Sequence, residues 1–343
     1  MCGIVGLHIL TKCNINIDNN YIFSILTVLF KNSVNLFALI TGFLYCKKEI
    51  HYKNIIKIVF IVLFYCILFT ILFRLIKPSI FSDKMVYFNS LFPIFSGRYW
   101  YPVSYVMLFF MIPFLNIMIN HLNKKDLELL IKIIFIFLCV ITTFGFYDFF
   151  KIYNGYSPFW LMYVYILGGY IKLYDFPKKI KRRSLCVLFC MNILIIWLSI
   201  IVIRYLTTRL IGHSIFENVL VQYNSPFVLM NSLIVFALLY KIKLENSLLK
   251  NSLEKIGYYA FEVYIIHAHF LVITNILPNI SKKMILIDNF LISLICLFIE
   301  IILIYLSCIM LGFIRSKIFS FFYIDSLIDK VGNHLDNFLS ISN

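Results

Sequence analysis

The stretch from Asn32 to Lys48, NSVNLFALITGFLYCKK, most constrains what this chain can fold into. It is an apolar run that carries Asn35 and Thr41 and ends abruptly at the charged residues 47–49. In lipid such a run must be helical, because every backbone polar group needs a partner within the segment. An amide in that helix is costly where it faces lipid, so we expect Asn35 to point into a protein interior or a cavity.

Composition extends this conclusion to the whole chain. Of its 343 residues, 62% are hydrophobic and 14% are charged, whereas soluble domains contain about 45–50% apolar and about 25% charged residues. We therefore expect an all-α fold, a polytopic bundle of transmembrane helices. The net charge of +15 would suggest nucleic acid in a soluble protein, but here it orients the helices, and we expect no nucleic-acid partner. The nine cysteines are scattered without a C-x-x-C pair, so we predict neither a disulfide framework nor a metal site.

Apolar runs between charges predict about ten spans, the first of them incomplete. They cover residues 2–11, 24–46, 55–76, 101–120, 130–149, 158–174, 185–206, 218–240, 256–277 and 285–313.

The Lys and Arg residues predict how these spans are oriented. Placing the loop at 47–57 inside and alternating puts most of the 31 basic residues on the inner side, including the dense cluster Lys178–Arg183. Cytoplasmic loops carry such an excess, so we expect a plasma-membrane protein with a cytoplasmic C-terminus. We expect residues 1–314 to form the membrane domain and residues 315–343 to form an amphipathic tail on the inner membrane surface.

A late helix carries the most specific pattern. In Ile256–His267 the residues Gly257, Ala260, Tyr264 and His267 fall at fixed spacing. This pattern resembles the late helix of the membrane acyltransferase 3 family, which combines a Gly, a small residue, a Tyr and a final His. Glu262 departs from the family pattern, and because a carboxylate within a membrane is costly, we expect it to face the interior. His267 and His269 are two residues apart on a helix and cannot hold one metal ion.

Three further blocks carry the same resemblance. Asn32–Lys48 is similar to the family's second helix, and Ser157–Tyr170 is similar to a later helix, whose glycines we interpret as packing sites. The aromatic residues that follow Arg98, with Pro113 late in the helix, resemble the family's third block. Arg98 stands where members often carry a polar group, so it could bind an anionic or sugar ligand.

The first residues can be read in two ways. MCGIVG matches the start of class II glutamine amidotransferases, but that chemistry needs a soluble domain of strands, which the following apolar segment excludes. The resemblance instead matches His8 to the family's essential histidine. Members carry an Arg about eleven residues earlier, a position that would precede Met1 here, so we expect a first helix truncated at its N-terminus.

The resemblance implies an integral-membrane O-acyltransferase. Such enzymes usually move an acetyl group from cytosolic acetyl-CoA to a hydroxyl of a surface polysaccharide or its lipid-linked precursor, with no bound cofactor. His8 is then the candidate catalytic base, since an unperturbed His pKa of about 6.5 suits this role. The candidate substrate-binding residues are Asn35, Arg98, Trp100, Glu262, Tyr264 and His267.

Two other classes of function remain as alternatives, a glycan polymerase or flippase and a transporter or other non-enzyme. A glycan polymerase would carry long outer loops rich in Arg, and a flippase would need about twelve or more spans. A transporter would show paired broken helices in its two halves, and the sequence shows none.

Overall fold

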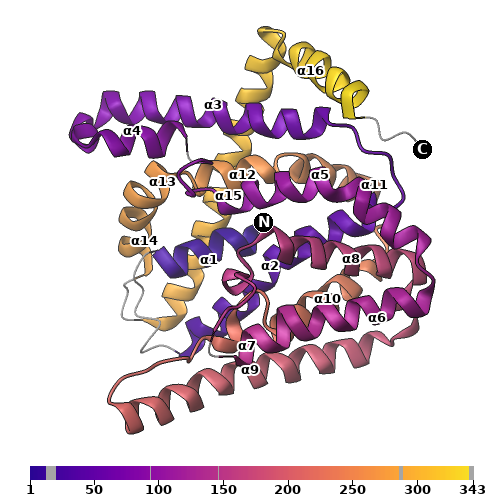
Figure 1. Ribbon diagram of the computed structural model, residues 1–343. Coiled ribbons are helices and arrows are strands. Elements are labelled where there is room, and N and C mark those ends of the chain that lie inside the picture. Colours follow the sequence, from indigo (N-terminus) through magenta and orange to yellow (C-terminus); the bar gives the residue numbers. More distant parts are fainter. Residues whose placement is uncertain (13–20, 93, 146, 286–288, 340–343) are drawn as a thin grey trace. The chain divides into compact units, whose positions relative to one another are not determined.

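The computed structural model describes all residues except 13–20, 93, 146, 286–288 and 340–343 (Figure 1). Within the described part every regular element is a helix, and no strand occurs. Seven helices there are long and apolar enough to cross a membrane. Two consecutive helical segments, Ser247–His267 and Phe270–Ser281, are bent by 60° and make an eighth span if counted together. The all-α, multi-pass membrane architecture is therefore confirmed.

The helix count differs from the ten predicted spans for a physical reason. The α1 helix (Cys2–Lys12) has 11 residues, whereas spanning the hydrocarbon core takes about 20. The α8 helix (Pro158–Tyr174) has 17 residues, which is the lower limit of the length that can span. Residues 256–277 are apolar throughout but contain the bend between α12 (Ala260–His267) and α13 (Phe270–Asn275). Apolar composition reveals such segments, but it does not reveal a break within them.

The chain forms two compact units, which are described separately. Unit 1 comprises residues 1–15, 50–102 and 244–343, and unit 2 comprises residues 16–49 and 103–243. The α5 helix (Trp100–His121) begins in the first and continues in the second.

Unit 2 is built around α2 (Tyr21–Tyr45), which packs most extensively against α8. The two backbones touch through glycines: a Cβ on Gly42 would lie 2.0 Å from the Tyr165 carbonyl oxygen, and one on Gly168 would lie 2.2 Å from that of Leu39. Small residues allow this close approach of helices in membranes. The predicted packing role of the glycine in 157–170 is therefore confirmed at Gly168.

The remaining helices of unit 2 surround this pair. The α9 helix (Arg182–Ile211) packs on α2 and on α10 (Pro226–Tyr240), while α6 (Lys124–Phe135) packs on α8. A π-helical turn, η3 (Ile136–Ile141), joins α6 to the short α7 (Thr142–Phe144).

Unit 1 is built around α15 (Phe290–Phe321). Three helices pack along it: α1, α12 and α14 (Leu277–Ile285). The α11 helix (Ser247–Tyr258) leads into α12.

The last helix of unit 1, α16 (Ile324–Leu339), packs on α3 (Lys53–Ile76), which also contacts α4 (Lys84–Leu91). The predicted boundary between residues 314 and 315 falls within α15, and Arg315 is buried there.

Candidate active site

Two histidines from distant parts of the chain form a hydrogen bond within unit 1. His8 lies on α1 and His267 is the last residue of α12, and His8 Nδ1 is 3.0 Å from His267 Nε2. His267 is 1% exposed, whereas His8 is half-buried. The pair combines one solvent-reachable imidazole with one buried imidazole.

The surroundings of His267 fix which nitrogens carry protons. His267 Nδ1 faces the Val263 carbonyl oxygen, and a carbonyl oxygen can only accept, so this nitrogen must donate. In the neutral ring Nε2 is then an acceptor, and His8 Nδ1 must donate to it. The basic lone pair of His8 is therefore on Nε2. A carbonyl, one histidine and a second histidine thus form a chain of the kind that orients a general base.

Aromatic rings enclose the histidine pair. Tyr264, one turn before His267 on α12, has its ring centroid 6.4 Å from that of His8. The rings of Tyr99 and Tyr101 lie 6.2 Å and 5.7 Å from Tyr264. The Tyr99 hydroxyl donates to the Ile265 carbonyl and ties the start of α5 to α12. The structure therefore brings His8, Tyr264 and His267 together in one apolar, aromatic environment.

Arg98 and Trp100 belong to the same unit, at the start of α5. The exposed Arg98 places its guanidinium 4.8 Å from the ring centroid of Phe270, the first residue of α13. Trp100 is half-buried and packs edge-on against Tyr101. Arg98 is thus an exposed cation beside the helix break that carries His267.

Glu262 forms a buried ion pair with Arg315. Its carboxylate oxygen is 2.6 Å from an Arg315 terminal nitrogen, and both side chains are at most 3% exposed. Gly312 allows this approach, since a Cβ there would meet Tyr259 at 2.8 Å. The expectation that Glu262 faces the interior is confirmed. Sequence reasoning missed Arg315, although an intramembrane carboxylate signals a nearby cation, and Arg315 lies just past the predicted last span.

Glu300 is the second buried carboxylate of unit 1. The Ser281 hydroxyl on α14 donates to its Oε1, while Oε2 has no hydrogen-bond partner among the described residues. The sequence indicated no partner for Glu300, and the structure supplies one that is 19 positions away in the chain.

Asn35 lies in unit 2 and is completely buried, as predicted. Its amide nitrogen donates to the Tyr223 carbonyl, and its oxygen accepts from the Trp160 indole N–H, both at 2.9 Å. Donor and acceptor thus link α2 to α8 and to the segment before α10.

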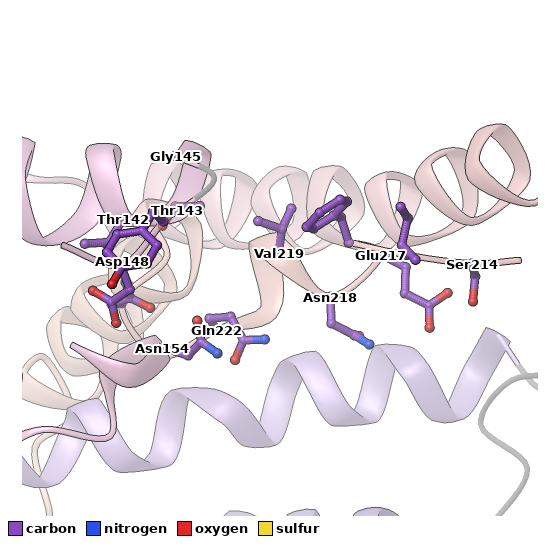
Figure 2. A pocket seen from close by; sticks show the side chains of 14 residues that line it. Thr142, Thr143, Gly145, Asp148, Asn154, Ser214, Glu217, Asn218, Val219 and Gln222 are labelled. Atoms are coloured by element: carbon purple, nitrogen blue, oxygen red, sulfur yellow. The ribbon is translucent and has the colours of Figure 1, made fainter. Parts of the chain in front are cut away.

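Unit 2 also contains a polar cavity of about 510 Å³. Figure 2 shows the amides of Asn154, Gln222 and Asn218 between Asp148 at one end and Glu217 at the other. No residue named from the family resemblance lines it. A separate cavity of about 480 Å³ is lined almost entirely by apolar side chains of α6, η3, α8 and the segment 150–152. In the part of the chain that the structure describes, no three His, Cys, Asp or Glu side chains come together as metal ligands would.

Comparison with known proteins gives one match. A protein-family model described as an acyltransferase domain matches residues 1–309, which include both histidines of the pair. No curated protein and no solved structure matches this chain.

Proposed function

This chain belongs to the acyltransferase 3 family of membrane proteins, and we propose that it transfers an acetyl group from acetyl-CoA to a hydroxyl group of a surface polysaccharide or its lipid-linked precursor. The observation that carries the proposal is the hydrogen-bonded pair His8–His267. Its tautomers leave the basic nitrogen on the half-buried ring of His8 rather than on the buried ring of His267.

The reaction needs one positioned base. His8 Nε2 takes the proton of the acceptor hydroxyl as that oxygen attacks the thioester carbonyl. A new C–O bond forms, the C–S bond breaks, and the CoA thiolate leaves and takes up a proton. The positive charge that develops on His8 is stabilised through its Nδ1–H bond to His267, because hydrogen bonds from charged donors are stronger than neutral ones. His267 is then a positioning residue, held by the Val263 carbonyl.

Arg98, Trp100 and Tyr264 are proposed to hold the substrates around this base. A guanidinium suits an anionic group of the acceptor, and aromatic rings suit the apolar face of a sugar. One observation favours the transporter alternative, because the helix is broken after His267 and transporters have broken helices. Among the described residues such a break occurs once, rather than as a pair in two halves.

Acetyl transfer can be tested directly. Membranes containing the protein, given radiolabelled acetyl-CoA and the glycan of the producing cell, are expected to release one CoA thiol for each acetyl ester formed. The matched control uses membranes with an equal amount of inserted His8→Ala protein. Unchanged acetylation of the surface glycan in a clean deletion strain would contradict the proposed donor and acceptor.

The proposed topology places the protein in the plasma membrane with a cytoplasmic C-terminus and the donor on the cytoplasmic side. The basic residues support it, because their excess favours the inner side. Reporter fusions at Lys179 and Lys250 are expected to report cytoplasm, and fusions at Asp83 and Thr208 are expected to report the outside. A cytoplasmic signal at Asp83 would overturn this arrangement.

A further inference from the structure

We propose that the polar cavity of unit 2 binds a sugar unit, a neutral carbohydrate that offers adjacent hydroxyl groups. The cavity is lined by residues within 142–145, 147–154 and 214–224, and it is large enough for one or two sugar rings. The role of this sugar as the acyl acceptor rests on the proposed function. The binding of sugar in the cavity does not.

Two buried polar groups in the wall lack protein partners. The Thr143 hydroxyl and the Asn224 side-chain oxygen have no hydrogen-bond partner among the described residues, and these side chains are only 5% and 2% exposed. Leaving a buried polar atom unpaired is costly. Neither oxygen is accessible from the cavity in this conformation, so we expect each side chain to rotate to meet a bound hydroxyl. A hydroxyl and an amide oxygen match the donors and acceptors of a sugar's hydroxyl groups.

Hydrogen bonds fix the conformation of the segment 148–155, which forms one wall of the cavity. The Asp148 carboxylate accepts from the backbone N–H groups of Ile152 and Tyr153, at 3.0 Å and 2.6 Å. Gly155 has a φ of +92°, and a Cβ there would lie 2.6 Å from the Tyr223 side chain. The turn is therefore fixed in a conformation that only Gly fits comfortably, and a rigid wall loses little entropy when a ligand binds.

The charges select the kind of ligand. The cavity contains the carboxylates of Asp148 and Glu217, the latter 2.7 Å from Arg204, and among the described residues no Lys or Arg side chain lines it. These carboxylates disfavour a phosphate or carboxylate ligand, and with it the phosphate-bearing CoA donor. Amides, hydroxyls and the exposed rings of Tyr147 and Phe216 remain for a neutral polyol, with rings that can pack on the apolar face of a sugar.

The helices leading to the cavity indicate the membrane side. The α6–α7 segment begins at Lys124 and α9 begins at Arg182, and both run toward the cavity from these basic ends. Basic ends favour the cytoplasm, so the cavity opens outside, where surface glycans are found.

The test measures sugar binding without acyl transfer. The full chain in lipid nanodiscs is titrated with triacetylchitotriose and maltotriose as neutral probes and with trigalacturonic acid as an acidic probe, followed by saturation-transfer NMR. We expect at least one neutral trisaccharide to bind more tightly than the acidic one. We expect Thr143→Val to weaken that binding by about threefold to tenfold, the effect of one hydrogen bond.

The neighbouring threonine supplies the matched control. Thr142 donates to the Leu138 carbonyl and accepts from Asn224, so Thr142→Val should lower the thermal midpoint, whereas Thr143→Val should not. Gln222→Leu, at a half-buried position of the wall, is the second binding variant. Equal affinity of the wild type, Thr143→Val and Gln222→Leu overturns the proposal, and so does tighter binding of the acidic trisaccharide.

The same nanodiscs separate this inference from the proposed function. Sugar binding that depends on Thr143, together with no acetyl transfer, would leave the cavity assigned and refute the acyltransferase mechanism. Acetyl transfer with an unchanged acceptor KM in Thr143→Val would support the acyltransferase mechanism and refute the cavity as the acceptor site. Triacetylchitotriose carried on a dodecyl chain distinguishes the sources, because tighter binding than the free sugar indicates a lipid-linked precursor and equal binding indicates a polymer.

Discussion

The two units bury polar groups of different kinds. In the described part of the chain, every buried Glu, Arg or His belongs to unit 1: Glu262, His267, His269, Glu300 and Arg315. The buried polar side chains of unit 2 are amides and hydroxyls. Its ion pairs lie nearer the surface, as between Asp175 and Lys178.

This difference indicates that unit 1 carries the groups for proton transfer and that unit 2 carries groups suited to binding a neutral ligand. Groups that gain or lose a proton are the ones that catalyse acyl transfer, and a membrane interior tolerates them only when they are paired. Neutral amides and hydroxyls bind neutral ligands and link helices at smaller cost. The comparison predicts that changes in unit 1 act on rate and folding, and that changes in unit 2 act on affinity and local packing.

The largest expected effect is at His8. His8→Ala should lower acyl transfer per inserted protein by about 10²–10⁴, because the positioned base is lost. The measurement is product formed at equal membrane abundance. His121→Ala is the matched control, since His121 is exposed and bonds only within its own helix. If His8→Ala keeps more than about a tenth of the wild-type rate, the base lies elsewhere, and His267 is the competing candidate.

Breaking the buried ion pair should come next. Glu262→Gln or Arg315→Met leaves an uncompensated charge and should destabilise unit 1 by about 3–5 kcal/mol. The double variant Glu262→Leu with Arg315→Met should regain most of the thermal stability, because no unpaired charge remains. Unfolding in nanodiscs measures both. A Glu262→Gln protein that keeps its thermal midpoint but loses acyl transfer would instead make Glu262 a substrate-binding residue.

The positioning role of His267 predicts a smaller effect. His267→Leu should lower kcat by about tenfold to a hundredfold, the value of one hydrogen bond to a charged group, with little change in KM. His267→Gln keeps an acceptor for His8 Nδ1–H and should recover part of the rate. Equal losses in the two variants would show that His267 acts through packing alone.

Local patterns predicted the helices and several site residues. The run after Asn32 predicted α2 and the burial of its amide, and the motif ending at His267 predicted the helix that carries the histidine. The partners could not be predicted, because they are distant in the chain. Nothing near Glu262 indicates that Arg315, 53 positions away, neutralises it, and Ser281 is likewise remote from Glu300. The bend after His267 was not predicted either, because the apolar composition of residues 256–277 is that of one continuous span.

The cavity of unit 2 escaped sequence reasoning for another reason. Its walls come from loops between spans, where the sequence shows only scattered Asn, Thr and Asp residues. The signal that could have indicated it is the density of turn-forming residues around Asn154 and Gly155. Such residues also occur in ordinary loops, so the polar cavity itself, which only the structure reveals, is what distinguishes this region.

The smallest expected effect is at the surface of unit 2. Lys178 donates a hydrogen bond to the Asp175 carboxylate, and Tyr240 adds a second one at 3.1 Å. The bond from Lys178 is the main cause that lowers the pKa of Asp175 below its ordinary value of 3.8. Because the pKa of Asp175 is lower in the folded protein, its ionised carboxylate adds to the free energy of unfolding. This addition is complete above the ordinary pKa of 3.8, and it is lost as the pH falls through the lower folded-state pKa. Asp175→Asn should therefore differ from wild type by a constant amount at neutral pH, and the difference should disappear in acid.

That constant difference should be small, because the pair is exposed to water and salt screens it. Residue 175 has a φ of +48° at the end of α8, and Asn tolerates this conformation as well as Asp does, so the substitution isolates the charge. The thermal midpoint in nanodiscs, measured against pH and beside Glu262→Gln, is the test. A shift at neutral pH as large as that of Glu262→Gln would break the comparison, since an exposed ion pair of unit 2 would then matter as much as the buried one of unit 1.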